Sequence, residues 1–192
     1  MGNERQAHLS SLRPSTEPVS ETALSQTIRS ATRQLHAPSG IDPASLLAAI
    51  AECESSYGAN RVPRFEPAYA PGGRYYKRSD RVRRECARFG ALASCSYGSF
   101  QILYITALEV MPVPFEPLDL QSDAFAIGAV TALLNRRFFD AQKITTVEDF
   151  ADAYNSGNAK DAVKPTAYIN KFVKHYRAAR TRRPELFAGG SV

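Results

Sequence analysis

One carboxylate of this chain combines a residue type and a position that could support acid–base chemistry. Glu54 lies near the end of a helix that the sequence predicts over residues 42–57, on the same face as Leu46, Leu47 and Ile50. An apolar surrounding disfavours a charged carboxylate, and so does the negative end of the helix dipole in the last turn. Both effects would raise the pKa of Glu54, so that its carboxyl could hold a proton near neutral pH and donate it. The alternative is a carboxylate that only borders the core and reaches solvent.

Three later stretches of the chain carry polar and aromatic side chains in a defined order. They are Ser96-Tyr97-Gly98-Ser99-Phe100-Gln101-Ile102, then Ala153-Tyr154-Asn155-Ser156-Gly157, and then Tyr168-Ile169-Asn170-Lys171-Phe172. Together with Glu54-Ser55, they resemble the lysozyme-like domain of soluble lytic transglycosylases and goose-type lysozymes, in which four such motifs follow one another. The resemblance covers about residues 41–176. Each motif alone is weak, and their order within one small domain makes the resemblance specific.

The resemblance implies a fold and an activity. The fold would be mainly α, of lysozyme-like α+β type, with a helical bundle around a central buried helix and a small β-hairpin lobe walling a glycan cleft. The activity would be that of a peptidoglycan-degrading muramidase that cleaves the MurNAc–GlcNAc β-1,4 bond. In a lytic transglycosylase one carboxyl, here Glu54, protonates the leaving oxygen. It then takes the proton of the muramic acid 6-hydroxyl, which closes a 1,6-anhydro ring.

The resemblance also implies substrate-binding residues, and the two strongest have structural alternatives. Gln101 would line the cleft, because its amide donates and accepts hydrogen bonds, or it would cap local backbone. Tyr154 would point at Glu54 and the bound sugar, or it would be a core tyrosine. Four more residues complete the expected site. Asn155 would shape the helix end, and Gly98 would let the backbone approach the sugar closely. Phe100 would form an apolar floor, and Ser96 would offer a hydroxyl group.

A second carboxylate near Glu54 would change the product. Glu66 is the candidate, because a hairpin in this part of the chain could place it across the cleft. Water could then be activated, and the protein would be a lysozyme-type hydrolase of the same bond. Otherwise Glu66 would be a solvated loop residue whose negative charge balances the positive charges of nearby arginines.

Local signals divide the chain into the elements that would position these residues. Asp42 can cap the Glu54 helix, and Thr146 with Asp149 can begin a helix that Gly157 ends. Short aromatic-rich runs on both sides of residues 71–73 (Pro-Gly-Gly) predict a loose hairpin. The other expected helices cover residues 20–36, 81–89 with a cap at Ser79-Asp80, 98–110, 122–139 and 165–176, and the apolar stretch 124–134 would form the central buried helix.

The chain is expected to have three regions. Residues 1–40 would form an N-terminal extension, residues 41–180 the lysozyme-like catalytic domain, and residues 181–192 a basic, flexible C-terminal tail. One helix of the extension carries a narrow apolar stripe, made of Leu24, Ile28, Ala31 and Leu35. This helix either packs on the catalytic domain or docks onto another protein, such as a virion component.

Composition restricts the remaining roles. The chain has 192 residues and a net charge of +5, and no apolar run is long enough for a membrane span. The odd number of cysteines (Cys53, Cys86 and Cys95) predicts reduced thiols, with a Cys86–Cys95 bridge as the alternative. The three histidines are scattered, so no metal and no cofactor are expected.

The start of the sequence and its basic character suggest where the protein would act. The first residues lack the apolar stretch of a secretory signal. We therefore expect synthesis in a host cytoplasm, followed by release to the cell wall through a holin or delivery within a virion, as for a phage endolysin or virion lysozyme. The basic surface would attract the acidic peptidoglycan envelope. A third hypothesis is an inactive virion structural or nucleic-acid-binding protein that kept the fold, with nucleic acid as the less favoured partner.

Overall fold

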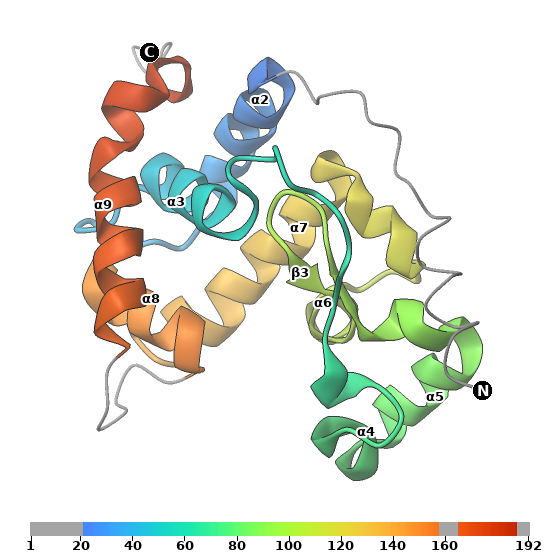
Figure 1. Cartoon of the computed structure of the whole chain (residues 1–192). Coiled ribbons are helices and arrows are strands. Elements are labelled where there is room, and N and C mark those ends of the chain that lie inside the picture. Colours follow the sequence, from blue (N-terminus) through green and yellow to red (C-terminus); the bar gives the residue numbers. More distant parts are fainter. Residues whose placement is uncertain (1–20, 158–164, 188–192) are drawn as a thin grey trace.

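The chain forms a mainly helical structure with one small antiparallel sheet, which confirms the mainly α fold class (Figure 1). The computed structural model describes residues 21–157 and 165–187. The helical elements are α2 (Glu21–Ala31), η1 (Thr32–Gln34), α3 (Pro43–Ser55), η2 (Pro67–Tyr69), α4 (Arg74–Arg78), α5 (Asp80–Phe89), η3 (Gly90–Ser94), α6 (Tyr104–Val110), η4 (Pro117–Gln121), α7 (Asp123–Leu133), the π-helix η5 (Leu134–Asp140), α8 (Val147–Ser156), α9 (Thr166–Arg182) and η6 (Pro184–Leu186). The strands are β1 (Arg64–Phe65), β2 (Cys95–Tyr97) and β3 (Ile102–Leu103). None of the helices in the two described ranges combines the length and the apolar character needed to cross a bilayer.

Helix α3 carries Glu54 and is buried along most of its length, since every residue from 44 to 51 is buried. The side chain of Asp42 caps its start by accepting a hydrogen bond from the Ser45 backbone N–H at 2.8 Å, as the sequence predicts. The helix ends two residues earlier than expected, because Ser56 and Tyr57 adopt left-handed backbone with φ of 53° and 57°. Glu54 therefore occupies the last turn of a buried helix.

Helix α7 crosses the middle of the molecule and contacts both α2 and α6 (Figure 1). Its buried residues include Ala126, Ile127 and Val130, which is consistent with the expected central helix. Its burial is not complete, because Ala124 is exposed and Phe125 is only half-buried. The helix expected over residues 122–139 is regular only as far as Leu133, after which the backbone continues as the π-helix η5.

The small sheet joins one strand, β1, to two strands that follow some thirty residues later in the sequence. Strand β1 pairs antiparallel with β2, with Arg64 opposite Ser96, and β2 pairs antiparallel with β3, with Tyr97 opposite Ile102. The hairpin is therefore β2–β3. The helix expected from residue 98 begins only at Tyr104.

The hairpin predicted around residues 71–73 is wrong. A 3-10 turn precedes these residues and helix α4 follows them, so neither flank is a strand paired with the other. Gly73 lies so close to the preceding turn that a Cβ atom there would be 2.3 Å from the Pro67 carbonyl oxygen. The Pro-Gly-Gly signal was a real turn signal, but it marks a tight connection between two helical segments.

Helix α2 belongs to the same hydrophobic core as the rest of the chain. Its apolar stripe is buried, with Leu24, Ile28 and Ala31 each no more than 2% exposed, and α2 contacts α3 and α7. The stripe is thus covered within the chain, and packing on the domain replaces docking onto another protein as its role. The expected boundary at residue 40 does not separate two cores, while residues 1–20 lie outside the described part of the chain.

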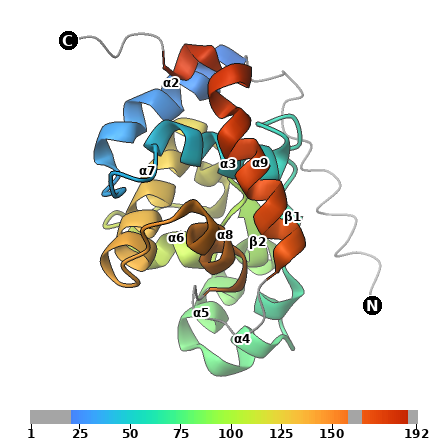
Figure 2. The ribbon, with the colours of Figure 1, turned by 90° about the vertical axis from the view of Figure 1, so that its left-hand side faces the viewer.

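The C-terminal region is also packed against the domain. Helix α9 runs along α3 (Figure 2), and Leu186 in η6 is buried. Arg183 forms an ion pair with Glu52 at 2.9 Å, with both side chains less than a fifth exposed. The expected flexible tail is therefore wrong for residues 181–187, and residues 188–192 lie outside the described ones.

Candidate active site

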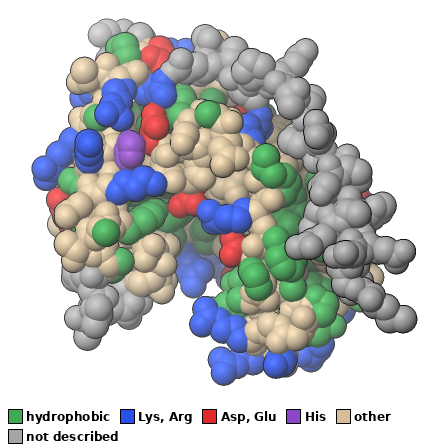
Figure 3. Space-filling model, viewed as in Figure 1, with side chains coloured by type: hydrophobic (Ala, Val, Ile, Leu, Met, Phe, Trp, Pro, Cys, Tyr) green, Lys and Arg blue, Asp and Glu red, His purple; other side chains and the backbone are tan. Residues whose placement is uncertain are grey.

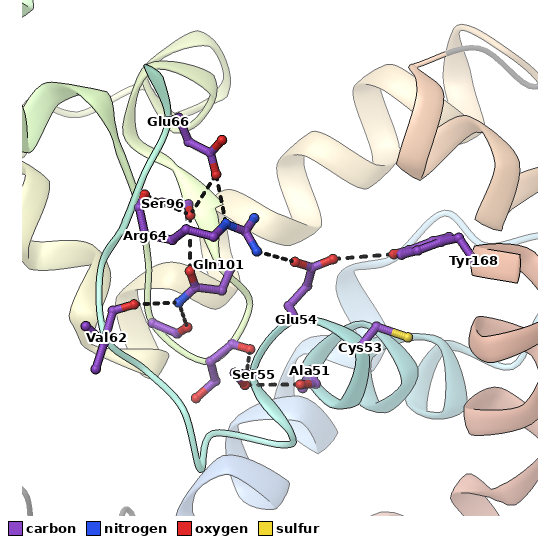
Figure 4. Close-up of polar contacts among 12 residues, drawn as sticks. Ala51, Cys53, Glu54, Ser55, Val62, Arg64, Glu66, Ser96, Gln101 and Tyr168 are labelled. Carbon is purple, nitrogen blue, oxygen red and sulfur yellow. Dashed lines mark hydrogen bonds and ion pairs between the residues drawn. The ribbon is translucent and has the colours of Figure 1, made fainter. Parts of the chain in front are cut away.

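A cavity of about 300 Å³ opens beside the end of α3. Its lining comes from eight helices and strands and from the turn between β2 and β3, and consists of Glu54, Arg64, Gln101, Ile102, Leu103, Thr106, Leu133, Arg137, Phe138, Tyr154, Asn155 and Tyr168. Figure 4 shows Glu54 between the sheet residues on one side and Tyr168 of α9 on the other. The structure thus brings the sequence-predicted Glu54, Gln101, Tyr154 and Asn155 to one cavity.

The carboxyl of Glu54 is partly withdrawn from water, with its side chain 15% exposed. Burial raises its pKa, as the sequence predicts. The charge of Arg64 and a hydrogen bond from Tyr168 act in the opposite direction, since both favour the carboxylate, but burial is the larger effect. The protonated form of Glu54 is therefore favoured relative to an ordinary glutamate.

Arg64 of β1 stands between two carboxylates (Figure 4). One terminal guanidinium nitrogen, Nη1, lies 3.7 Å from Oε2 of Glu54, while Nε donates to Oε1 of Glu66 at 2.9 Å. Glu66 therefore faces Glu54 across a guanidinium, and it does not line the cavity. Its charge still contributes to the raised pKa of Glu54, as the smallest of the causes. The expected second carboxylate is near the acid, but Arg64 engages it.

Two tyrosines from different helices line the cavity together with Glu54. The hydroxyl of Tyr168 on α9 donates to Oε1 of Glu54 at 3.4 Å. Tyr154 on α8 stacks on Phe150 with ring centroids 5.6 Å apart and also lines the cavity. Burial raises the pKa of both phenols, and the charge of Glu54 adds to this effect, so both hydroxyls stay protonated. Tyr154 thus satisfies both interpretations, as a packed aromatic and as a cavity residue.

Gln101 lines the cavity with its amide held by local groups. Its Nε2 donates to the Gly98 carbonyl at 3.0 Å, and its Oε1 accepts from the Ser96 hydroxyl at 3.1 Å. The backbone of Gln101 has a φ of 43°, a left-handed conformation that costs a non-glycine residue about 1 kcal/mol or more. The alternative that the Gln101 amide caps local backbone is therefore confirmed. The same hydrogen bonds hold the side chain of this strained residue at the cavity wall.

Three expected sugar contacts are corrected by the structure. Gly98 has a φ of 70°, and a Cβ atom there would lie 2.5 Å from the Leu120 carbonyl oxygen, so the close approach it permits is to η4 and not to a ligand. Phe100 is completely buried in the core. Ser96 is 1% exposed and bridges Gln101 and Glu66, at 3.1 and 3.5 Å. None of the three lines the cavity.

Ser55 explains why a serine follows the glutamate. Its buried hydroxyl donates to the Ser99 carbonyl at 2.6 Å and accepts from the Gly58 N–H at 2.7 Å. The bond to Ser99 attaches the end of α3 to the turn between β2 and β3, and the bond from Gly58 holds the chain that follows α3. The Ser55 side chain thereby fixes the position of Glu54 relative to Gln101.

Among the cavity residues that sequence reasoning missed are two arginines and a tyrosine, namely Arg64, Arg137 and Tyr168. Tyr168 belongs to the fourth motif, and that motif is the sequence signal that points to it. Arg64 reaches Glu54 only because β1 pairs with β2, some thirty residues away in the sequence. Arg137 reaches the cavity from the π-helix, whose backbone the residue pattern does not indicate.

The cysteines and the acidic residues form no further site among the described residues. All three cysteines are free thiols, so the alternative Cys86–Cys95 bridge is absent. Burial raises the pKa of Cys53, next to Glu54, to about 11, which keeps that thiol protonated. In residues 21–157 and 165–187, no group of three or more His, Cys, Asp and Glu side chains is arranged to hold a metal ion.

Comparisons with protein-family models, with curated proteins and with solved structures found no match.

Proposed function

We propose that this chain is a peptidoglycan-degrading muramidase of lysozyme-like fold that cleaves the MurNAc–GlcNAc β-1,4 bond as a lytic transglycosylase. The observation that carries the proposal is Glu54, a mostly buried carboxyl with a raised pKa at a cavity of about 300 Å³. A protonated carboxyl at a cavity is the group that acid-catalysed glycoside cleavage requires. The motif order and the convergence of Gln101, Tyr154 and Tyr168 on that cavity support the same proposal.

In the proposed reaction, Glu54 gives its proton to the glycosidic oxygen while the bond from that oxygen to C1 of MurNAc breaks. GlcNAc leaves with a free 4-hydroxyl. The resulting carboxylate accepts the proton of the muramic acid 6-hydroxyl as O6 bonds to C1, so Glu54 regains its proton and no water is consumed. Arg64 at 3.7 Å and the Tyr168 hydroxyl at 3.4 Å would stabilise the carboxylate between these two steps.

A lysozyme-type hydrolase is the second candidate, and the position of Glu66 favours it. A second carboxylate is the usual partner of the acid in glycosidases, and Glu66 is linked to Glu54 through Arg64. The ion pair of Glu66 with Arg64, at 2.9 Å, weakens this candidate, because the guanidinium occupies a carboxylate oxygen that would have to accept the proton of a water. For this reason transglycosylation is the preferred proposal.

Product analysis tests the proposal and separates the two candidates. Purified peptidoglycan is incubated with the protein, and the soluble fragments are identified by mass spectrometry. We expect 1,6-anhydro-MurNAc ends. Reducing MurNAc ends would instead support the hydrolase, and the absence of soluble fragments would contradict both candidates and favour an inactive virion or nucleic-acid-binding protein.

A further inference from the structure

The π-helix η5 carries two residues of the cavity lining, Arg137 and Phe138. π-Helical turns are rare and are frequently found at functional sites. Phe138 is buried and packs on Phe150 and Tyr154, with ring centroids 5.5 and 6.0 Å apart, so it anchors the segment in the core. Arg137 precedes it and is exposed. The π-helix therefore combines a fixed aromatic anchor with a charged side chain at the cavity.

The guanidinium of Arg137 lies beside the C-terminal end of α8. Its Nη2 atom is 3.9 Å from the position that a Cβ atom of Gly157 would occupy, and Asn155 of the same helix end lines the cavity. A cation is favoured at a helix C-terminus, where the helix dipole is negative. This attraction holds the Arg137 side chain near the cavity. It does not require the N–H donors of the guanidinium to bond to another side chain.

Arg137 differs from the other arginine of the cavity in its partners. Arg64 pairs with Glu54 and Glu66, whereas Arg137 has no hydrogen bond or ion pair to any residue in the described part of the chain. With Glu54 protonated, the charges of Arg64 and Glu66 offset each other. Among the described residues, one positive charge, that of Arg137, is then left without an anion at the cavity.

We propose that Arg137 binds a carboxylate of the substrate, so that the cavity selects a glycan whose substituents carry carboxylates over a neutral one. This inference rests on the proposed function and extends it, because the peptide substituents of peptidoglycan supply such carboxylates. A planar guanidinium with five N–H donors matches a carboxylate in a two-bond arrangement. Figure 3 shows a hollow between the part of the molecule that carries α8 and α9 and the part that carries α4, with basic side chains at its edges.

The test measures binding, so that it does not depend on turnover. Full-length protein with Glu54→Gln is titrated by calorimetry with soluble glycan strands that carry uncrosslinked peptides. A second batch of the same strands has its carboxylates converted to carboxamides. Adding Arg137→Gln should weaken binding of the native strands about tenfold or more, which is the usual effect of losing a hydrogen bond to a charged group. Amidation should weaken binding to the parent by a similar factor, and the two changes together should have no further effect.

Arg136→Gln is the matched control, because Arg136 is a neighbouring exposed arginine that donates to the Glu109 carbonyl and does not line the cavity. It should bind both batches like the parent. Equal binding of native and amidated strands by the parent, or an unchanged affinity with Arg137→Gln, would overturn the inference even if the wild type cleaves peptidoglycan. If the wild type cleaves nothing while Arg137-dependent binding persists, the proposed function is wrong and the role of Arg137 stands. An absence of any binding would contradict both.

Discussion

The charge of Arg64 should set the pH at which the proposed acid loses its proton. Its guanidinium is 3.7 Å from the Glu54 carboxylate, and two unit charges at that distance attract each other by about 1 kcal/mol in bulk water and about 4 kcal/mol at an effective dielectric constant of 20. Because the Arg64 side chain is 55% exposed, the lower figure applies. A stabilisation of about 1 kcal/mol corresponds to roughly 0.8 of a pH unit.

Arg64→Gln removes this stabilisation of the carboxylate and should raise the pKa of Glu54. Since the acid is active when protonated, the alkaline limb of the kcat/KM profile should move to higher pH by roughly 0.8 of a unit. Glu66→Gln should move it to lower pH, because it removes a negative charge that raises the pKa of Glu54 and releases Arg64 to pair with that carboxyl. The rate of peptidoglycan solubilisation from pH 4 to 9 gives both profiles.

The opposite directions of these two changes make the test sharp. Arg78→Gln is the matched control, since it removes the same charge from an exposed residue of α4 that does not line the cavity, and its profile should equal that of the wild type. Displacements of both variants in the same direction, or profiles indistinguishable from the control, would refute the assignment of Glu54 as the titrating acid.

Three further variants test other parts of the account. Glu54→Gln should increase the free energy of unfolding near pH 7.5 but not at pH 4. The pKa of Glu54 is higher in the folded state than its ordinary value of 4.5, so the wild type loses stability as the pH rises from 4.5 through the folded pKa. The loss is about 1.4 kcal/mol for each tenfold gain in proton affinity. Urea unfolding at both pH values measures this difference, and a stability gain of the variant at pH 4 would contradict the reasoning. Tyr168→Phe removes the hydroxyl 3.4 Å from Glu54 and should lower kcat about threefold to tenfold in steady-state kinetics, whereas an unchanged kcat would show that this contact is idle. Ile28→Ala, at a fully buried position of α2, should reduce the free energy of unfolding by about 2–5 kcal/mol, and a negligible loss in the same urea assay would mean that α2 is not part of the core.

Features that depend on neighbouring residues could be predicted from the sequence. The caps at Asp42, Ser79 and Thr146 and the left-handed Gly157 are all confirmed, because each requires only a side chain or a backbone conformation within a few residues. The raised pKa of Glu54 was predictable for the same reason, since the helix pattern places it at the end of an apolar face.

Features that depend on distant contacts could not be predicted. The pairing of β1 with β2 brings Arg64 to Glu54, and no local pattern indicates which of several short runs will pair. Gly98 was recognised as a position that needs glycine, but the atom that approaches it belongs to Leu120. Phe100 was recognised as apolar, but whether it faces the cavity or the core depends on a turn whose geometry emerges only in the folded chain.

The most direct test of the central claim is the release of soluble glycan fragments by Glu54→Gln beside wild type, with Glu109→Gln as a control at an exposed glutamate of α6 outside the cavity lining. Glutamine keeps the shape of the side chain and cannot transfer a proton. We expect wild type and Glu109→Gln to release fragments with 1,6-anhydro-MurNAc ends, and Glu54→Gln to release none above background while it remains folded. Release by Glu54→Gln at the wild-type rate would contradict the account.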